Sequence, residues 1–358
     1  IDGSDLGYIS EEIHKKIARY IVNTNDIIIT IAGTIGEVAL VSKKFDGVNL
    51  TENAVRLTEF SKDVCPEFLA YILKSPERKE YMEQVAGGSA QPKLGIYKIE
   101  AIKVDLPDIQ IQHKIADILS AYDDLIENNQ KQIKLLEEAA QRLYKEWFVD
   151  LRFPGHANTK IVDGVPEGWI KSTVSEVSAI LRRGISPKYN EKARGIVINQ
   201  KCIRQTIVSY DEARTQEKKY PDELKMMESD ILICSTGAGT LGRVGQVFEA
   251  KENVTLDSHV TLIRANERVG QQYLFWSLKM QQDYLMSAGK GSTNQLELSR
   301  ETIGNCEILV PERKMAGQAE KNFAAIHDKM KECSMKITRL REARDLLLPK
   351  LMSGEMEV

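Results

Sequence analysis

One uninterrupted apolar stripe constrains this chain more than any other feature. It lies within residues 112–148, a stretch without Pro or Gly, and its seam positions alternate in steps of three and four from Ile126 to Trp147. That period is typical of an α-helix that packs along one seam against another helix. A helix over this stretch would be about 55 Å long at roughly 1.5 Å per residue. A single apolar seam with charged flanks needs a partner helix to bury it.

The C-terminal part of the chain supplies that partner. Residues 319–350 carry apolar side chains at the same steps, and their sequence is related to the first stripe. Adding 204 to the numbers of Ile133 and Leu136 leads to Ile337 and Leu340. Two unrelated amphipathic helices are the simpler interpretation, but the constant offset favours a tandem duplication. We expect the seam to be formed by Ile126, Asn129, Ile133, Leu136, Leu143, Trp147, Phe148, Phe323, Met330, Ile337, Leu340 and Leu347.

The regions before the two stripes repeat as well, at offsets of 203 to 206. Matching segments are 26–30 with 230–234, 33–38 with 239–244, and 68–74 with 273–279. Each copy predicts a buried strand, a glycine turn, a second strand and then a helix. In the first copy the helix opens at Pro66, and a last strand is expected over 102–106 before Pro107.

The sequence therefore predicts mixed α/β domains, duplicated, each followed by a long α-helix. The expected parts are a first domain 1–108, a long helix 109–150, a linker 151–166, a second domain 167–311 and a last helix 312–358. The copies differ in length, because about 60 residues of the second domain precede Asp230 and only 25 residues precede Asp26. We expect a first domain that lacks roughly 40 N-terminal residues of its counterpart.

Composition narrows the class of protein. Apolar residues make up 42% and charged residues 28%, and no apolar run approaches 18 residues, so a soluble globular protein without a membrane span is expected. The five cysteines are scattered without a CxxC pair, which predicts reduced thiols in an intracellular protein and no zinc site. The histidines are dispersed too, and we interpret His259 as structural or superficial.

Charge is uneven although the net charge is only −3. Residues 171–204 hold eight basic and two acidic side chains, whereas residues 110–150 carry an excess of acidic ones. The basic segment could face phosphate, with Arg, Asn and Gln able to pair with base edges. Its candidate DNA contacts are Arg182, Arg183, Lys188, Tyr189, Lys192, Arg194, Asn199, Gln200, Lys201 and Arg204. A solvated surface is the alternative.

Two matching glycine-containing loops add candidates, because exposed backbone N–H groups and small hydroxyls suit close approach to phosphate. Their residues are Lys290, Ser292, Thr293 and Asn294 in the second copy, and Gly88, Ser89, Gln91 and Lys93 in the first. A simple turn that needs glycine is the alternative. No catalytic or metal-binding residue is expected.

Two further patterns suggest nucleotide or nuclease chemistry but fit it poorly. Residues 237–242 are glycine-rich, yet they lack the GK[ST] ending of a P-loop, and Arg243 is expected to begin a strand. Asp230 with Glu249 and Lys251 resembles a D…ExK nuclease motif, but the first copy has no matching ExK. A strand–turn–strand role is favoured for the first pattern and a structural role for the second.

Three motifs in order on this duplicated scaffold resemble the specificity (S) subunit of type I restriction-modification systems. They are 165–169 (VPEGW) followed by 184–187 (GISP), 143–150 (LYKEWFVD), and 347–355 (LLPKLMSGE). The resemblance covers the whole chain. The short start of the first domain departs from the family pattern and puts the completeness of that domain in doubt.

The resemblance implies a non-catalytic, cytoplasmic DNA-binding subunit. Each globular domain would be a target recognition domain for half of an asymmetric bipartite site, and the helices would pair as an antiparallel coiled coil between them. The implied partners are double-stranded DNA, two methyltransferase subunits and motor-nuclease subunits. S-adenosylmethionine, ATP and Mg²⁺ are expected only in those partner subunits. Trp147 and Phe148 would anchor the scaffold or a methyltransferase.

Two other functions compete with DNA specificity. A coiled-coil scaffold without DNA affinity would show no salt dependence, whereas phosphate binding weakens steeply as salt rises. A nuclease would lose cleavage when Asp230 or Glu249 is replaced. The repeat, the basic segment and the resemblance favour the DNA-specificity subunit.

Overall fold

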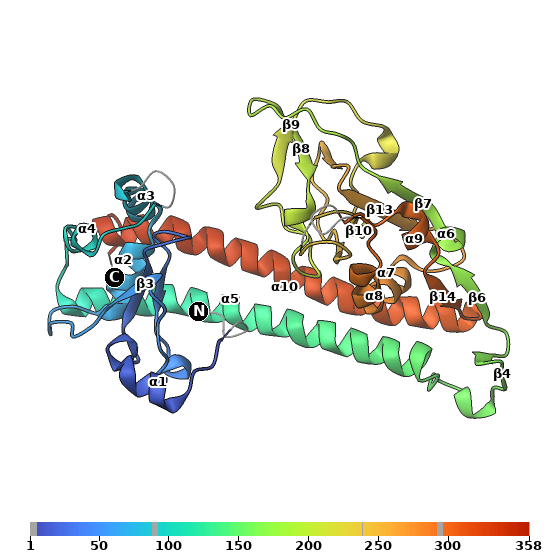
Figure 1. Cartoon of the computed structure of the whole chain (residues 1–358), viewed down its shortest axis with the longest axis horizontal. Helices are drawn as coiled ribbons and strands as arrows, with labels where there is room; N and C mark the ends of the chain where they lie inside the picture. Colours follow the sequence, from blue (N-terminus) through green and yellow to red (C-terminus); the bar gives the residue numbers. More distant parts are fainter. Residues whose placement is uncertain (1–5, 88–91, 238, 292–295, 358) are drawn as a thin grey trace. The chain divides into compact units, whose positions relative to one another are not determined.

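The computed structural model describes residues 6–87, 92–237, 239–291 and 296–357 (Figure 1). Two compact units divide the chain: residues 1–128 with 336–358, and residues 129–335. Both long helices contribute to both units, because the unit boundaries fall inside them. None of the helices that the structure describes is long and apolar enough to cross a bilayer.

The first unit is built on a three-stranded antiparallel sheet in the order β2-β1-β3. Cys65 precedes a proline that opens the first helix after the sheet, as the sequence predicts, and a buried apolar face of that helix covers the strands. The elements are α1 (Glu11–Lys16), β1 (Ile27–Thr30), β2 (Val38–Leu40), β3 (Ala54–Leu57), α2 (Pro66–Lys74), α3 (Pro76–Val85), α4 (Ile96–Glu100) and the first part of α5 (Ile109–Tyr144).

The second unit contains a four-stranded antiparallel sheet in the order β11-β10-β13-β7, and a three-stranded sheet β12-β8-β9. Figure 1 shows β8 and β9 on the side of the unit away from the last helix. The strands are β4 (Ile161–Val162), β5 (Val165–Pro166), β6 (Ile170–Thr173), β7 (Ser178–Arg183), β8 (Gly195–Ile198), β9 (Arg214–Gln216), β10 (Ile231–Cys234), β11 (Val244–Gln246), β12 (Val254–Leu256), β13 (Val260–Ala265) and β14 (Glu307–Val310). The helices are α6 (Val174–Val177), α7 (Gln271–Met280), α8 (Gln282–Ser287), α9 (Arg300–Gly304) and α10 (Arg313–Ser353), with a π-helical turn at Lys145–Val149 after α5.

Strand register confirms the duplication. In the first unit Ile27 of β1 lies opposite Leu57 of β3, and in the second Ile231 of β10 lies opposite Ile263 of β13. These residues match at offsets of 204 and 206, as the repeat predicts. A one-residue slip would turn the buried side chains toward solvent, so the two copies conserve the same core face.

The predicted last strand of the first domain is wrong. Residues 102–106 form no strand, although their counterpart β14 pairs with β6 along its whole length. The described part of the first unit contains no counterpart of β6. A strand is defined by its hydrogen-bonded neighbour, and this segment has none to pair with.

The two long helices pack together within the first unit. Ile115 of α5 is buried in one apolar cluster with Leu351 of α10. Further along α5, the Asp123 carboxylate accepts a hydrogen bond from the Arg344 guanidinium at 2.5 Å. Residue numbers therefore rise along α5 as they fall along α10, so the helices run antiparallel here.

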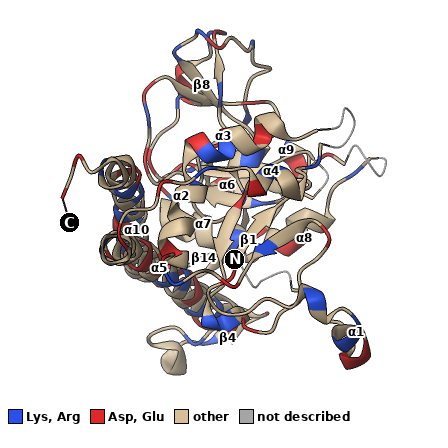
Figure 2. Cartoon of the chain, turned by 90° about the vertical axis from the view of Figure 1, so that its left-hand side faces the viewer, with Lys and Arg blue, Asp and Glu red and all other residues tan. Residues whose placement is uncertain are grey.

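The helices are also antiparallel within the second unit. The Cys333 thiol contacts the Gln132 side-chain oxygen at 3.4 Å, and the Tyr144 ring centroid lies 6.4 Å from that of Phe323. Figure 2 shows basic and acidic residues interspersed along the ribbons of α5 and α10. All the seam residues named above are buried or half-buried, including Asn129.

Candidate nucleic-acid interface

Several loops of the second unit meet where the carboxyl ends of β7, β8 and β10 adjoin the start of β13. The Asp257 N–H donates to the Ile198 carbonyl at 2.9 Å, and the Ser235 N–H donates to the His259 carbonyl at 2.7 Å. The Leu298 N–H donates to the Ser235 carbonyl at 2.8 Å. We call the side chains of Arg183, at the end of β7, and of Gln200, Thr236, His259 and Lys290, beyond the strand ends, the strand-end surface.

The glycine-rich turn between β10 and β11 packs against the predicted phosphate-binding loop. Thr236 and Lys290 each form an antiparallel bridge with Glu297. Gly289 permits this approach, because a Cβ at that position would overlap the Leu241 side chain. Gly237 has φ +106°, a conformation that L side chains rarely adopt. The turn joins two strands, as predicted, and its glycines allow close backbone packing.

Arg183 is tied to this surface rather than extended into solvent. Its guanidinium binds the Glu297 carboxylate and donates to the Leu298 carbonyl at 2.7 Å. Lys201 and Lys290 are exposed, as is Glu297. The strand-end surface therefore combines one exposed lysine, Lys290, with a charge-paired arginine.

His259, which the sequence analysis interpreted as structural or superficial, lies on the strand-end surface. Its Nδ1 lies 2.6 Å from the Thr236 hydroxyl, and its backbone N–H donates to the Asp257 carboxylate at 2.9 Å. Burial raises the pKa of Asp257, while the His259 N–H and the nearby imidazole act in the opposite direction. The imidazole is exposed to solvent, and its contact with Thr236 fixes its orientation. Its position before the run 260–263 (VTLI) was the one available signal, and such a position is too common to identify a site.

A second group of candidate residues lies beside β9. Lys188 binds Glu217 at 2.5 Å, and the Arg214 guanidinium lies 3.5 Å from the centre of the Tyr189 ring. The ion pair raises the pKa of Lys188, and hydrogen bonds from Lys188 and Asn190 lower the pKa of Glu217. Arg214 was missed because the basic segment was taken to end at residue 204. A stacked arginine presents a flat cation to a nucleic acid.

The remaining basic candidates differ in whether they form an ion pair. Arg182 binds Glu223, and Arg204 lies 3.7 Å from Glu212. Lys192 and Arg194 are exposed and form no ion pair among the described residues.

Asn199 is a poor candidate for base readout. It is only 7% exposed, its amide donates to the Glu212 carbonyl at 2.6 Å, and its Oδ1 accepts the Lys201 N–H at 2.8 Å. Both polar atoms are thus engaged in capping the turn after β8. Its neighbour Gln200 is half-buried, beside Gly237.

The first unit has a matching surface. Ala32 and Gly87 each form an antiparallel bridge with Lys93, just as Thr236 and Lys290 do with Glu297. Lys93 is exposed. The predicted contacts Gly88, Ser89 and Gln91, and likewise Ser292, Thr293 and Asn294, lie outside the described residues.

The aromatic residues at the end of α5 pack against their own domain. The Phe148 ring lies 4.7 Å from Tyr273 and 5.6 Å from Trp169, and Trp147 is only 8% exposed in the same cluster. The prediction that Trp147 and Phe148 anchor the scaffold therefore fits this packing. The other prediction, a methyltransferase contact, does not, because little of either side chain reaches solvent.

Asp230 is buried and held by an ion pair and hydrogen bonds within its own domain. Arg264 donates to its two carboxylate oxygens at 2.5 and 2.7 Å, and the Met227 N–H donates to the same carboxylate at 2.7 Å. Asp230 is only 2% exposed. A carboxylate neutralised in this way is a poor ligand for a catalytic metal ion.

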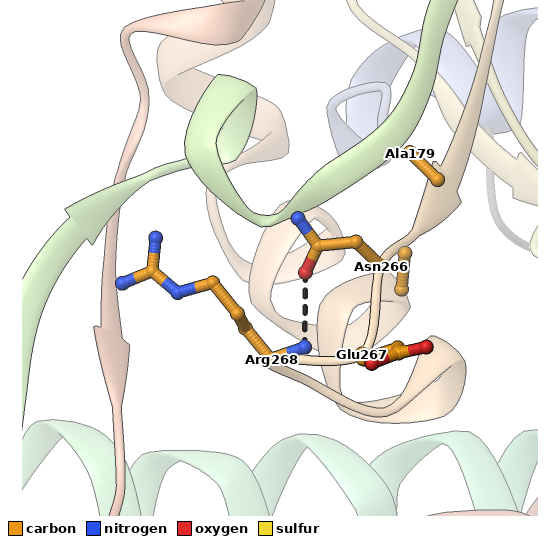
Figure 3. Close-up of a pocket in the computed structure, with 5 residues that line it drawn as sticks. Ala179, Asn266, Glu267 and Arg268 are labelled. Atoms are coloured by element: carbon orange, nitrogen blue, oxygen red, sulfur yellow. Dashed lines mark hydrogen bonds between the residues drawn. The ribbon is translucent and has the colours of Figure 1, made fainter.

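A shallow hollow lies at the opposite end of β13 and β7 from the strand-end surface (Figure 3). It is lined by Ala179, Ala265, Asn266, Glu267 and Arg268. The Asn266 side chain accepts the Arg268 N–H at 3.0 Å, which stabilises the turn. This hollow provides positions for control substitutions.

Comparison with known proteins gives a consistent result. The family model described as "Type I restriction modification DNA specificity domain" matches residues 3–138 and 166–328, which is most of the chain. The MjaIX type I restriction enzyme specificity subunit of Methanocaldococcus jannaschii is 25% identical, over 98% of this chain and 82% of that protein. The HindI specificity subunit of Haemophilus influenzae is 26% identical, over 82% of this chain and 78% of its own length.

The fold also has a relative of known structure. The crystal structure of the type I restriction-modification S subunit from M. genitalium aligns with a TM-score of 0.54 at 18% identity. The alignment covers 93% of this chain and 84% of that one. The duplicated α/β domains with long helices are thus a known architecture.

Proposed function

The chain belongs to the specificity subunits of type I restriction-modification systems, and we propose that it reads an asymmetric DNA site made of two separated half-sites. Each α/β domain would read one half-site. Sequence specificity for DNA and assembly into a larger complex are properties of the family. The bipartite site, the two separate readers and the residues involved are the content of the proposal.

One observation carries the proposal: the two domains repeat one backbone scaffold, but side chains at matched positions differ. The sheets share one register, and the bridges at Lys93 and Glu297 occupy matched positions. The side chains at those positions differ, a lysine in one copy and a glutamate in the other. Two readers with one backbone and different side chains should prefer different base sequences. The site read by the whole chain would then be asymmetric.

The charged residues suggest how each domain would hold its half-site. Lys201 and Lys290 are exposed point charges suited to phosphate oxygens, and the Arg214–Tyr189 stack offers a flat cation. Phosphate contacts set orientation, whereas base contacts select sequence. Two readers held by a helical spacer suit half-sites about one helical turn apart, roughly 34–36 Å.

Catalysis would then belong to partner subunits. We propose two methyltransferase subunits and, for restriction, motor-nuclease subunits. S-adenosylmethionine, ATP and Mg²⁺ would bind to those partners and not to this chain. The engaged carboxylate of Asp230 agrees with a non-catalytic role.

Co-expression with the adenine methyltransferase encoded beside this chain tests the proposal directly. Modified bases are mapped across the host genome, with the methyltransferase alone as the control. Methylation at a two-part motif with a fixed gap is expected. Methylation at a single half-motif would mean that only one domain reads DNA. Stable co-purification without sequence-specific methylation would contradict the proposal and favour a scaffold.

A further inference from the structure

His259 and Asn53 occupy the same place in the two domains. The Ser235 N–H donates to the His259 carbonyl at 2.7 Å, and the Ile31 N–H donates to the Asn53 carbonyl at the same distance. Each residue directly precedes the third strand of the shared sheet, β13 for His259 and β3 for Asn53. Each residue is exposed. The backbone is therefore equivalent at this position while the side chain is not.

The His259 side chain and the His259 backbone each have a partner that holds them in place. The Thr236 hydroxyl lies 2.6 Å from Nδ1, and the buried Asp257 carboxylate accepts the backbone N–H. Thr236 is itself held by its bridge to Glu297. With Nδ1 engaged by Thr236, Nε2 is the ring nitrogen left to meet a ligand. A side chain held in one orientation loses little conformational entropy when it binds.

We propose that His259 is a specificity-determining contact of the second domain, with Thr236 and Asp257 as its positioning residues. This inference rests on the proposed function and deepens it. Lys290, the exposed cation of the strand-end surface, would orient the backbone of the DNA, while Nε2 would form a hydrogen bond with a base edge. Asn53 is the matched position in the first domain, and Asn is able to pair with adenine through two hydrogen bonds.

Replacing His259 in the full complex tests the inference. The variants are His259→Ala, His259→Asn, which copies the first domain, and Thr236→Val, which replaces the hydroxyl with a methyl group. Glu267→Gln, at the far end of β13, is the matched control. The readouts are the genomic methylation motif and competition binding between DNA duplexes that differ at one base pair.

We expect His259→Ala to relax one position of the half-site read by the second domain, with discrimination there falling on the order of tenfold. His259→Asn should change the preferred base at that position, and Thr236→Val should weaken the preference. The other half-site and the gap should stay unchanged, and Glu267→Gln should behave as the wild type.

The alternative is that His259 only links two turns of its own domain and does not contact a base. In that case the variants would lower methylation equally at all sites without changing the motif, which would overturn the inference. A two-part motif that His259→Ala and His259→Asn both leave unchanged would overturn it as well. A wild-type complex without any two-part motif would instead overturn the proposed function, and this inference with it.

Discussion

The two domains share three strands in the same register, but the edges of their sheets differ. In the second unit β13 lies between β10 and β7, whereas in the described part of the first unit β3 pairs with β1 alone. The segment 102–106 is likewise unpaired, while its counterpart β14 has β6 as a neighbour. The same local sequence pattern therefore gives a strand only where a second strand is present to share its hydrogen bonds.

The largest expected effect concerns the helix positions that match between the units. Phe323 and Leu119 differ by 204 in number, and both are fully buried. Phe323→Ala should lower the free energy of unfolding of the second unit by about 3–5 kcal/mol, and Leu119→Ala that of the first by about 2–5 kcal/mol. Tryptophan fluorescence during denaturation reports the second unit, because all three tryptophans are in it. Hydrogen exchange reports the unfolding of the first unit.

Leu119→Ala should leave the tryptophan transition unchanged. A shift of that transition as large as the one caused by Phe323→Ala would mean that the two units unfold as one, and the comparison between them would fail.

The buried ion pairs should give the next largest effect. Arg264 makes two short hydrogen bonds to Asp230, whereas Arg56 is 3.7 Å from the matching Asp26. Arg264→Ala leaves a buried carboxylate without its cation and should destabilise the second unit by about 3 kcal/mol. Arg56→Ala should cost the first unit less, about 1 kcal/mol. Hydrogen exchange of β10 and β1 measures both, and equal losses would contradict the structural difference.

The edge of β3 that has no neighbouring strand among the described residues should be detectable in hydrogen-exchange rates without any mutation. The amides of residues 54–57 that face away from β1 should exchange on the order of tenfold faster, or more, than those of β13, which lie between two strands. Mass spectrometry of peptides from the full chain measures this, with the central strands β1 and β10 as internal references. Equal protection of β3 and β13 would show that another segment covers the edge.

The smallest expected effect concerns pH. His327 is 4% exposed and its ring lies 4.5 Å from Phe248, and burial lowers its pKa despite the nearby carboxylates of Asp328 and Glu228. A histidine with a lowered pKa in the folded state stabilises the fold above its unfolded pKa of about 6.5. The stability of the second unit should therefore fall as pH drops from about 6.5 toward the pKa of the folded state.

His327→Gln should flatten that dependence, as measured by tryptophan fluorescence during denaturation at pH 7.5 and 5.5. The matching residue of the first unit is Asp123, which binds Arg344 and accepts a hydrogen bond from the Tyr71 hydroxyl at 2.7 Å. A variant that keeps the full pH slope of the wild type would show that another group titrates.

Much of the fold could be predicted because it follows from patterns that are visible along the sequence. The stripe from Ile126 to Trp147 has a helical period, and helices α5 and α10 begin at residues that differ by 204, as the repeat requires. The strand 26–31 was predicted from an apolar run and is β1. Less of the candidate site could be predicted. Arg183 and Lys290 lie on the strand-end surface, but Asn199 is buried, and His259 and Arg214 were missed.

The sequence by itself determined the duplicated domains and the helical seams, because periodicity and a repeat can be read along the chain without knowing which segments meet in the fold. The tertiary structure alone decided which polar groups remain available. The partners of Arg183 and Tyr144 are 115 and 133 residues distant along the chain, at Leu298 and Ser277. Such pairing depends on where the folded backbone places each side chain, and no local pattern encodes it.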